Sequence, residues 1–131
     1  MIALDTNILV RFVAQDDPVN SPRANAIMSS ISIDEPAWIA ITAVAEFAWV
    51  MSRVLRIERA DVYSLLDQLL KRPDVVVEQA DLVRKAANQF RSGGAEFSDY
   101  LVACSGEAAG CTHTLTFDRK AAKSAGMTLA R

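Results

Sequence analysis

Four acidic side chains stand far apart in the 131-residue chain, and together they have the chemistry of a phosphodiester-hydrolysing site: Asp5, Glu46, Asp99 and Asp118. Carboxylates that share one cleft repel each other, and a hard divalent cation relieves that repulsion. Ligand sets made only of oxygen suit Mg²⁺ or Mn²⁺ rather than zinc. One such ion lowers the pKa of a bound water, and a second at ~3.5–4 Å stabilises the leaving oxygen. The four acids therefore predict metal-dependent hydrolysis.

Three of these acids stand where predicted elements meet. Asp5 comes after an apolar run at the N-terminus that predicts a buried strand. Asp99 opens a helix whose predicted cap is Ser98. Asp118 separates a predicted strand over residues 112–117 from a short basic helix. Parallel α/β connections gather such junctions at one edge of the sheet, although an acid at a helix start also serves simply as a cap.

Glu46 is informative because it is the only charged residue between Glu35 and Arg53. Apolar residues surround it on nearly every face of a helix predicted from Thr42 to Leu55, so we expect it to be at least partly buried. A buried carboxylate must be protonated, paired or bound to a cation. Arg53 lies seven residues on, on the same helical face, and an ion pair between the two is the structural alternative. We favour a role in the acidic site.

Strands alternate with helices along the whole chain. Predicted strands cover residues 2–4, 37–40, 75–77, 112–117 and 127–129, and helices with apolar stripes lie between them, including one capped by Ser21 before Pro22 and one from Asp99 to about Ala109. This alternation predicts an α/β fold, specifically a three-layer α/β/α sandwich with a mostly parallel central sheet. The length favours one domain over residues 1–131.

The bulk composition is that of a globular protein, with 51% apolar and 23% charged residues. A net charge of −2 excludes a strongly basic nucleic-acid binder but allows a local basic patch. Cys104 and Cys111 lack a CxxC spacing and are predicted to be core residues in a reducing compartment. No basic region precedes an apolar stretch, and no uncharged stretch reaches the ~20 residues of a membrane span. We therefore expect a cytoplasmic protein that does not enter the membrane.

Four segments in this order, LDTNILVRF, the Glu46 helix, FSDYLVA and TFDRKAAKSAG, resemble a PIN-domain ribonuclease, specifically the VapC-type toxin of a toxin–antitoxin pair. The resemblance implies an RNA substrate, Mg²⁺ or Mn²⁺, and a homodimer bound to a small antitoxin protein. It also implies a set of catalytic and metal-binding acids and of supporting polar residues; the acids are Asp5, Glu46, Asp99 and Asp118, and the supporting residues are Thr6, Asn7 and Thr116. Arg119 and Lys120 follow Asp118 with no further acid, which weakens the case for a second metal.

Two surfaces are candidates for contact with partners. Basic residues that follow the site acids in sequence face substrate phosphates or form a solvated surface: Arg11, Arg119, Lys120 and Lys123. A leucine stripe wider than a core contact needs is a candidate dimer surface: Leu65, Leu66, Leu69 and Leu70.

Other enzyme classes lack their residues in this chain. An aspartyl phosphatase needs an acid where Asn7 stands, and His113 is the only histidine, with no Gly-x-Ser-x-Gly elbow. The sequence contains neither a Walker loop nor GxGxxG. The remaining alternative is a non-catalytic PIN-like module that binds RNA or protein. The intact set of acids favours the enzyme.

Overall fold

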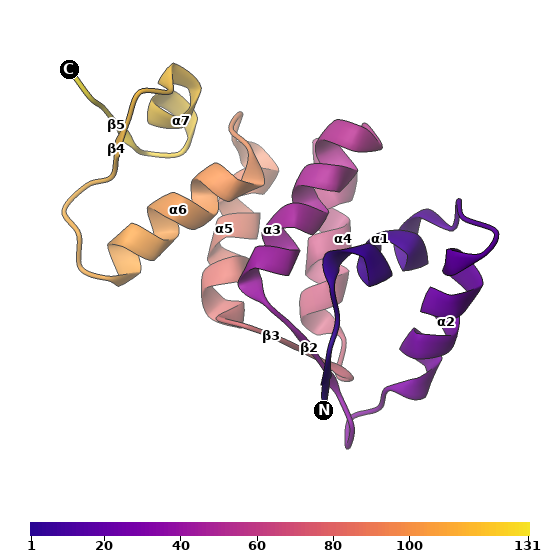
Figure 1. Ribbon diagram of the computed structural model, residues 1–131. Coiled ribbons are helices and arrows are strands. Elements are labelled where there is room, and N and C mark those ends of the chain that lie inside the picture. Colours follow the sequence, from indigo (N-terminus) through magenta and orange to yellow (C-terminus); the bar gives the residue numbers. More distant parts are fainter.

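Helices and strands alternate from the N-terminus in a computed structural model that describes residues 1–131 (Figure 1). Seven α-helices, one π-helical turn and five short strands follow one another in the order β1 (Ile2–Ala3), α1 (Thr6–Ala14), α2 (Asn20–Ser30), β2 (Ala37–Ile39), α3 (Ile41–Trp49), η1 (Val50–Val54), α4 (Arg59–Lys71), β3 (Val75–Val77), α5 (Ala80–Ser92), α6 (Phe97–Ala108), β4 (Leu115–Thr116), α7 (Arg119–Ser124) and β5 (Thr128–Leu129). The predicted α/β class is confirmed. None of the helices combines the length and the apolar character needed to cross a bilayer.

All strand pairs are parallel, but the strands form two sheets. β1, β2 and β3 lie side by side in that order, with Ala3 opposite Trp38 and Trp38 opposite Val76. β4 and β5 pair only with each other, with Leu115 opposite Thr128. We call residues 111–131, which contain β4, α7 and β5, the C-terminal unit. Figure 1 shows this unit in yellow, on the far side of α5 and α6 from β1.

The core lies between the helices and the three-stranded sheet. Its largest fully buried side chains include Ile39, Met51, Leu66, Phe90 and Tyr100. The predicted apolar face of α5 is confirmed, because Val83, Ala86, Ala87 and Phe90 are all buried.

The connection between α4 and the end of α5 depends on one arginine. The guanidinium of Arg59 lies 4.4 Å from the centre of the Phe90 ring and donates to the carbonyl oxygens of Phe90 and Ala95, at 3.0 and 2.8 Å. The carbonyl groups at the end of a helix have no partners within it. Arg59 satisfies one of them while it covers the aromatic ring.

The strand at the N-terminus differs from its prediction. We expected it to be buried, but Ile2 is 50% exposed and Ala3 is exposed, so only Leu4 enters the core. The physical reason is that no strand pairs with the second edge of β1. Parallel strands are normally covered on both faces.

Two predicted helix caps are wrong. α2 begins at Asn20 rather than after Ser21, because the carboxylate of Asp17 accepts from the backbone N–H groups of Val19 and Asn20, at 2.9 and 2.8 Å. α6 begins at Phe97, before Ser98. In both cases an acidic side chain near the start of the helix accepts the backbone N–H bonds that we had assigned to a serine hydroxyl.

Other predictions are too broad or only half right. The predicted strand over residues 112–117 shortens to β4, and the predicted helix over 42–55 becomes α3 followed by a π-helical turn. Cys104 is buried as predicted, but Cys111 is exposed. In the leucine stripe, Leu66 and Leu69 are core residues and the other two are partly buried, so this stripe offers little free surface.

Asp74 connects α4 to β3 and should make stability depend on pH. The guanidinium of Arg72 donates two hydrogen bonds to its carboxylate, both at 2.9 Å, and these hold the pKa of Asp74 below its usual value. A lowered pKa in the folded state stabilises the protein above the unfolded pKa of about 3.9, and this contribution is lost as the pH falls through the folded pKa.

We expect Asp74→Asn to lower the free energy of unfolding at pH 7 by up to about 1 kcal/mol, the upper range for a partly exposed pair. The difference from wild type should vanish at acidic pH, below the folded pKa of Asp74, where the wild-type carboxyl is protonated and as uncharged as asparagine. Urea unfolding at the two pH values measures it. Asp81→Asn, in an exposed pair with Arg84 on α5, is the control and should change stability little at either pH. An equal loss of unfolding free energy at both pH values would contradict the assignment of this contribution to the ionised carboxylate of Asp74.

Candidate active site

Asp5 is the N-cap of α1. Its carboxylate Oδ1 accepts from the backbone N–H of Thr6 at 2.7 Å, and the side chain is exposed to solvent. Thr6 is buried, with its hydroxyl 3.5 Å from the carbonyl oxygen of Ala43 on α3. Asn7 is exposed beside them. This capping bond leaves the second carboxylate oxygen of Asp5 without a hydrogen bond within the chain.

Asp5 and Glu46 meet at one surface cavity. This cavity of about 240 Å³ is lined by the start of α1 and the middle of α3, and its polar lining is Asp5, Thr6, Asn7, Arg11 and Glu46. It lies beyond the carboxyl end of β1, as expected for a parallel sheet. The sequence placed these two acids together, and the fold brings them to the same hollow.

Glu46 is exposed, and the prediction that it is at least partly buried is wrong. α3 directs Val44, Phe47 and Ala48 into the core, while Glu46 and Trp49, three residues apart, face solvent. The apolar neighbours of Glu46 in the sequence therefore do not predict whether its own side chain is buried.

The predicted alternative, an ion pair between Glu46 and Arg53, is also wrong. Arg53 lies in the π-helical turn η1, where the backbone no longer follows α-helical spacing, and its guanidinium pairs with Glu96 at the start of α6. No basic side chain forms an ion pair with Glu46. Glu46 thus keeps its charge available to the cavity.

Asp99 stands in the first turn of α6. Its carboxylate Oδ2 accepts from the backbone N–H of Glu96 at 3.1 Å, in a capping arrangement. The start of α6 packs against α3, where Glu96 and Phe97 share a small crevice with Ala48. Asp99 therefore lies on a neighbouring element, outside the lining of the Asp5–Glu46 cavity. Glu96 was not singled out from the sequence. Glu96 stands at the helix cap and Asp99 three residues later, and this capping-box spacing would have indicated it.

Asp118 lies outside the lining of the Asp5–Glu46 cavity. It is the N-cap of α7, with Oδ1 accepting from the backbone N–H groups of Lys120 and Ala121, at 2.8 and 3.1 Å. Thr116 supports it, because the Thr116 hydroxyl accepts from the Asp118 backbone N–H at 3.0 Å. Both residues belong to the C-terminal unit, which Figure 1 places across α5 and α6 from β1.

The acids that line the cavity do not form a complete metal site. Carboxylate and amide oxygens at the cavity have the right chemistry for Mg²⁺ or Mn²⁺. However, nowhere in the chain do three acidic, histidine or cysteine side chains come close enough to hold one ion together. Asp5 and Glu46 supply two carboxylates, and a third is lacking.

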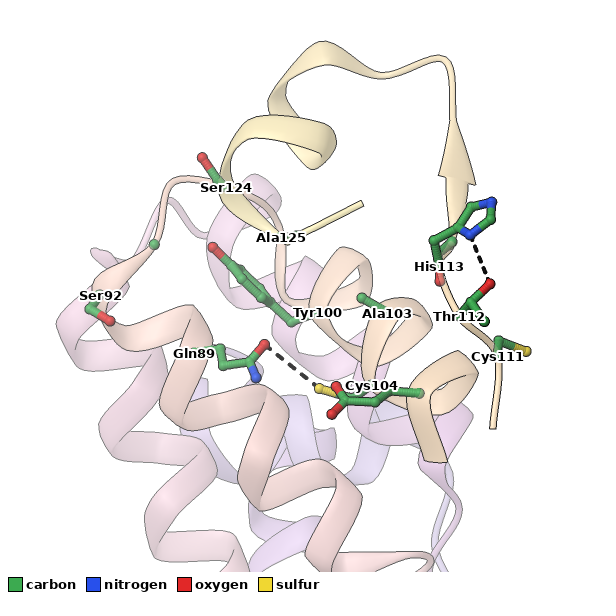
Figure 2. Close-up of a pocket in the computed structure, with 14 residues that line it drawn as sticks. Gln89, Ser92, Tyr100, Ala103, Cys104, Cys111, Thr112, His113, Ser124 and Ala125 are labelled. Atoms are coloured by element: carbon green, nitrogen blue, oxygen red, sulfur yellow. Dashed lines mark hydrogen bonds between the residues drawn. The ribbon is translucent and has the colours of Figure 1, made fainter. Parts of the chain in front are cut away.

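The largest cavity lies elsewhere, between the C-terminal unit and helices α5 and α6 (Figure 2). It has a volume of about 650 Å³ and is lined by residues that include Gln89, Tyr100, Cys104, His113 and Ser124. Burial raises the pKa of the Cys104 thiol, whose sulfur is 3.7 Å from the side-chain oxygen of Gln89. A thiol with a raised pKa is a poor nucleophile. The Cys104 thiol is therefore a poor candidate for a nucleophile in this cavity.

Comparison with known proteins identifies the family. A comparison with curated protein sequences gives no match. The family model described as PIN domain matches residues 2–126, nearly the whole chain. PIN domains are generally nucleases, and they typically use divalent metals. With parallel strands between helices, and with two acids meeting at the end of β1, the chain belongs to the PIN domain family.

Proposed function

We propose that this protein is a metal-dependent endoribonuclease that uses Mg²⁺ or Mn²⁺, and that it is the toxin of a type II toxin–antitoxin pair. The observation that carries the nuclease proposal is the meeting of Asp5 and Glu46 at one open cavity. An exposed hollow with acids and a nearby arginine suits a long, flexible polyanion better than a small enclosed substrate. The toxin role rests on the resemblance of the four sequence segments.

The residues at the cavity have separable tasks. Arg11 lines the cavity and is positioned to hold a phosphate, although it now pairs with Asp16 at 2.7 Å. Asp5 or Glu46 can accept a proton from an attacking water. Thr6, which is buried, holds the start of α1 against α3 and so keeps the two acids in place. A bound divalent ion would supply charge to stabilise the leaving oxygen.

Cleavage of a single-stranded RNA with and without metal tests the proposal. We expect cleavage in Mg²⁺ or Mn²⁺, none in excess EDTA, and recovery when Mg²⁺ is restored. Asp5→Asn should lose at least ~100-fold in rate, the lower range for a positioned catalytic group. It should melt like the wild type, since asparagine caps a helix about as well as aspartate.

Asp61→Asn, an exposed acid in the first turn of α4, is the control and should cleave normally. Undiminished cleavage in EDTA would contradict the metal. An Asp5→Asn protein that melts early but stays active would mean that Asp5 serves only as a cap.

One observation favours a second candidate, a non-catalytic module that binds RNA or protein. Two carboxylates without a third are a weak metal site. Such a module would bind labelled RNA with an affinity that falls as the salt concentration rises. Added Mg²⁺ or Mn²⁺ would not bring about cleavage. The same RNA assay therefore separates the two candidates.

A further inference from the structure

An exposed tryptophan stands next to the cavity that holds Asp5 and Glu46. Trp49 lies on α3 three residues after Glu46, and its side chain is 54% exposed. Residues at this spacing are neighbours on a helix surface, with Cβ atoms roughly 5–6 Å apart. Large aromatic side chains contribute most to stability when they are buried. Half of this indole instead remains uncovered beside the candidate active site, where a ligand can cover it.

Trp49 lies between the cavity and the start of α6. With 3.6 residues in each turn, Val50 and Trp49 stand on opposite flanks of Glu46. Val50 lines the cavity together with the start of α1. Trp49 lines a small crevice together with Ala45 and with the start of α6, including Ser98. The indole therefore lies on the surface that joins the cavity to the helix that carries Asp99.

The neighbours of the indole are mostly charged or polar. Glu46 lies one turn before it, and the ion pair between Arg53 and Glu96 borders the crevice. Along α3 and η1, the only other exposed large apolar residue is Val54. Protein partners typically cover a broad, contiguous apolar patch. A single flat ring among ionic and hydroxyl groups better matches a nucleobase, which has an apolar face and polar edges.

We propose that the indole of Trp49 stacks on an unpaired base of the RNA, beside the phosphodiester that lies at the Asp5–Glu46 cavity. This inference rests on the proposed function and defines its substrate further. A base within a duplex is already stacked on both faces, so the RNA must be single-stranded at the cleaved position. Stacking on an aromatic ring tolerates every base, so Trp49 selects an unpaired strand rather than a sequence.

The two sides of the cavity would hold different parts of the same strand. Arg11, on the α1 side, faces the phosphate, while Trp49, on the α6 side of Glu46, holds the base. Surfaces that bind single strands combine basic and aromatic side chains in this way. The indole has no group that transfers a proton at neutral pH. Trp49 is therefore a positioning residue that fixes the strand against the two acids.

Fluorescence from one tryptophan tests the contact without any cleavage. The chain has two tryptophans, so Trp38→Phe leaves Trp49 as the only one. Asp5→Asn in the same chain, which we expect to be inactive, keeps the RNA intact in Mg²⁺. A short single-stranded oligoadenylate should quench the fluorescence of Trp49 until it saturates, and its duplex with oligouridylate should quench it far less. Absence of quenching by the single strand, or equal quenching by the duplex, would overturn the inference.

Three variants of the otherwise unchanged chain separate stacking from apolar contact. Trp49→Ala should raise KM for a single-stranded RNA roughly fivefold or more, the lower end of the loss expected for one base–aromatic stack. It should leave kcat near the wild-type value, as expected when binding alone is weakened. Trp49→Phe keeps an aromatic face and should recover most of the affinity. Val54→Ala is the matched control, because Val54 is 56% exposed but has no aromatic face, and it should change neither constant.

Other results would contradict the stacking. A wild-type KM in Trp49→Ala, or equal increases of KM in Trp49→Ala and Val54→Ala, would overturn the inference. A change of molecular size in Trp49→Ala by light scattering, with unchanged affinity for RNA, would assign the surface to a protein contact instead. If the wild type cleaves no RNA, the proposed function fails, and the fluorescence measurement with the intact strand alone decides the inference.

Discussion

Glu46→Gln is expected to reduce RNA cleavage at least ~100-fold while leaving the melting temperature of the metal-free protein unchanged or slightly raised. The side chain is exposed, lines the cavity with Asp5, and has no basic partner whose charge would be left uncompensated. Replacing it removes one of two neighbouring negative charges without changing any packing. Metal-free stability should therefore hold steady or rise slightly. Paired measurements of single-turnover cleavage and thermal melting check both halves.

Glu58→Gln is the matched control for this variant. Glu58 is also exposed, precedes α4, and makes no side-chain bond to the start of that helix. It should leave both cleavage and melting unchanged. If the Glu46→Gln protein cleaves RNA at the wild-type rate, Glu46 on α3 takes no part in cleavage. Asp5 would then be the only acid of the cavity with a proposed catalytic role.

Phe90→Ala is expected to have the largest effect on stability, about 4 kcal/mol in the free energy of unfolding. Phe90 is 1% exposed and packs edge-to-face against Phe97 and Tyr100, with ring centres 5.9 and 6.4 Å away. Its loss leaves a cavity and removes the aromatic face over which Arg59 lies. The melting temperature should fall by roughly 10 °C or more.

Phe90→Leu distinguishes volume from aromatic contact. Leucine restores most of the buried volume, so it should recover much of the lost stability but not the contribution of the ring. Chemical denaturation of the three proteins measures the two parts. If Phe90→Ala unfolds at nearly the wild-type denaturant concentration, the junction of α4, α5 and α6 is not the centre of the core.

Local patterns predicted local structure well. The apolar stripe on α5 could be predicted from the spacing of its own residues alone. The apolar run before Asp5 correctly indicated a strand followed by the start of a helix. The meeting of Asp5 and Glu46 also followed, since both lie on elements beside the first strand. The roles of the four acids and of the supporting residues remain predictions.

Burial and strand partners were harder to predict because they depend on distant residues. Glu46 has apolar neighbours in sequence, but the side of α3 that faces the core is decided by packing against α1 and α6. The partner of β4 depends on how the whole chain folds back. The sequence indicated its strand character and the acid that follows it, but its separation from the first sheet was not apparent.

The π-helical turn after α3 has a consequence for insertions and deletions. A π-turn holds one more residue than an α-helical turn, so it behaves like a single-residue insertion inside an otherwise regular helix. Deleting one residue from η1 (Val50–Val54) would restore the regular spacing and rotate every later side chain about the helix axis. The arginine that now pairs with Glu96 would turn away from the start of α6, and this ion pair would be lost. In this view, a single extra backbone residue holds the start of the helix that carries Asp99 in place.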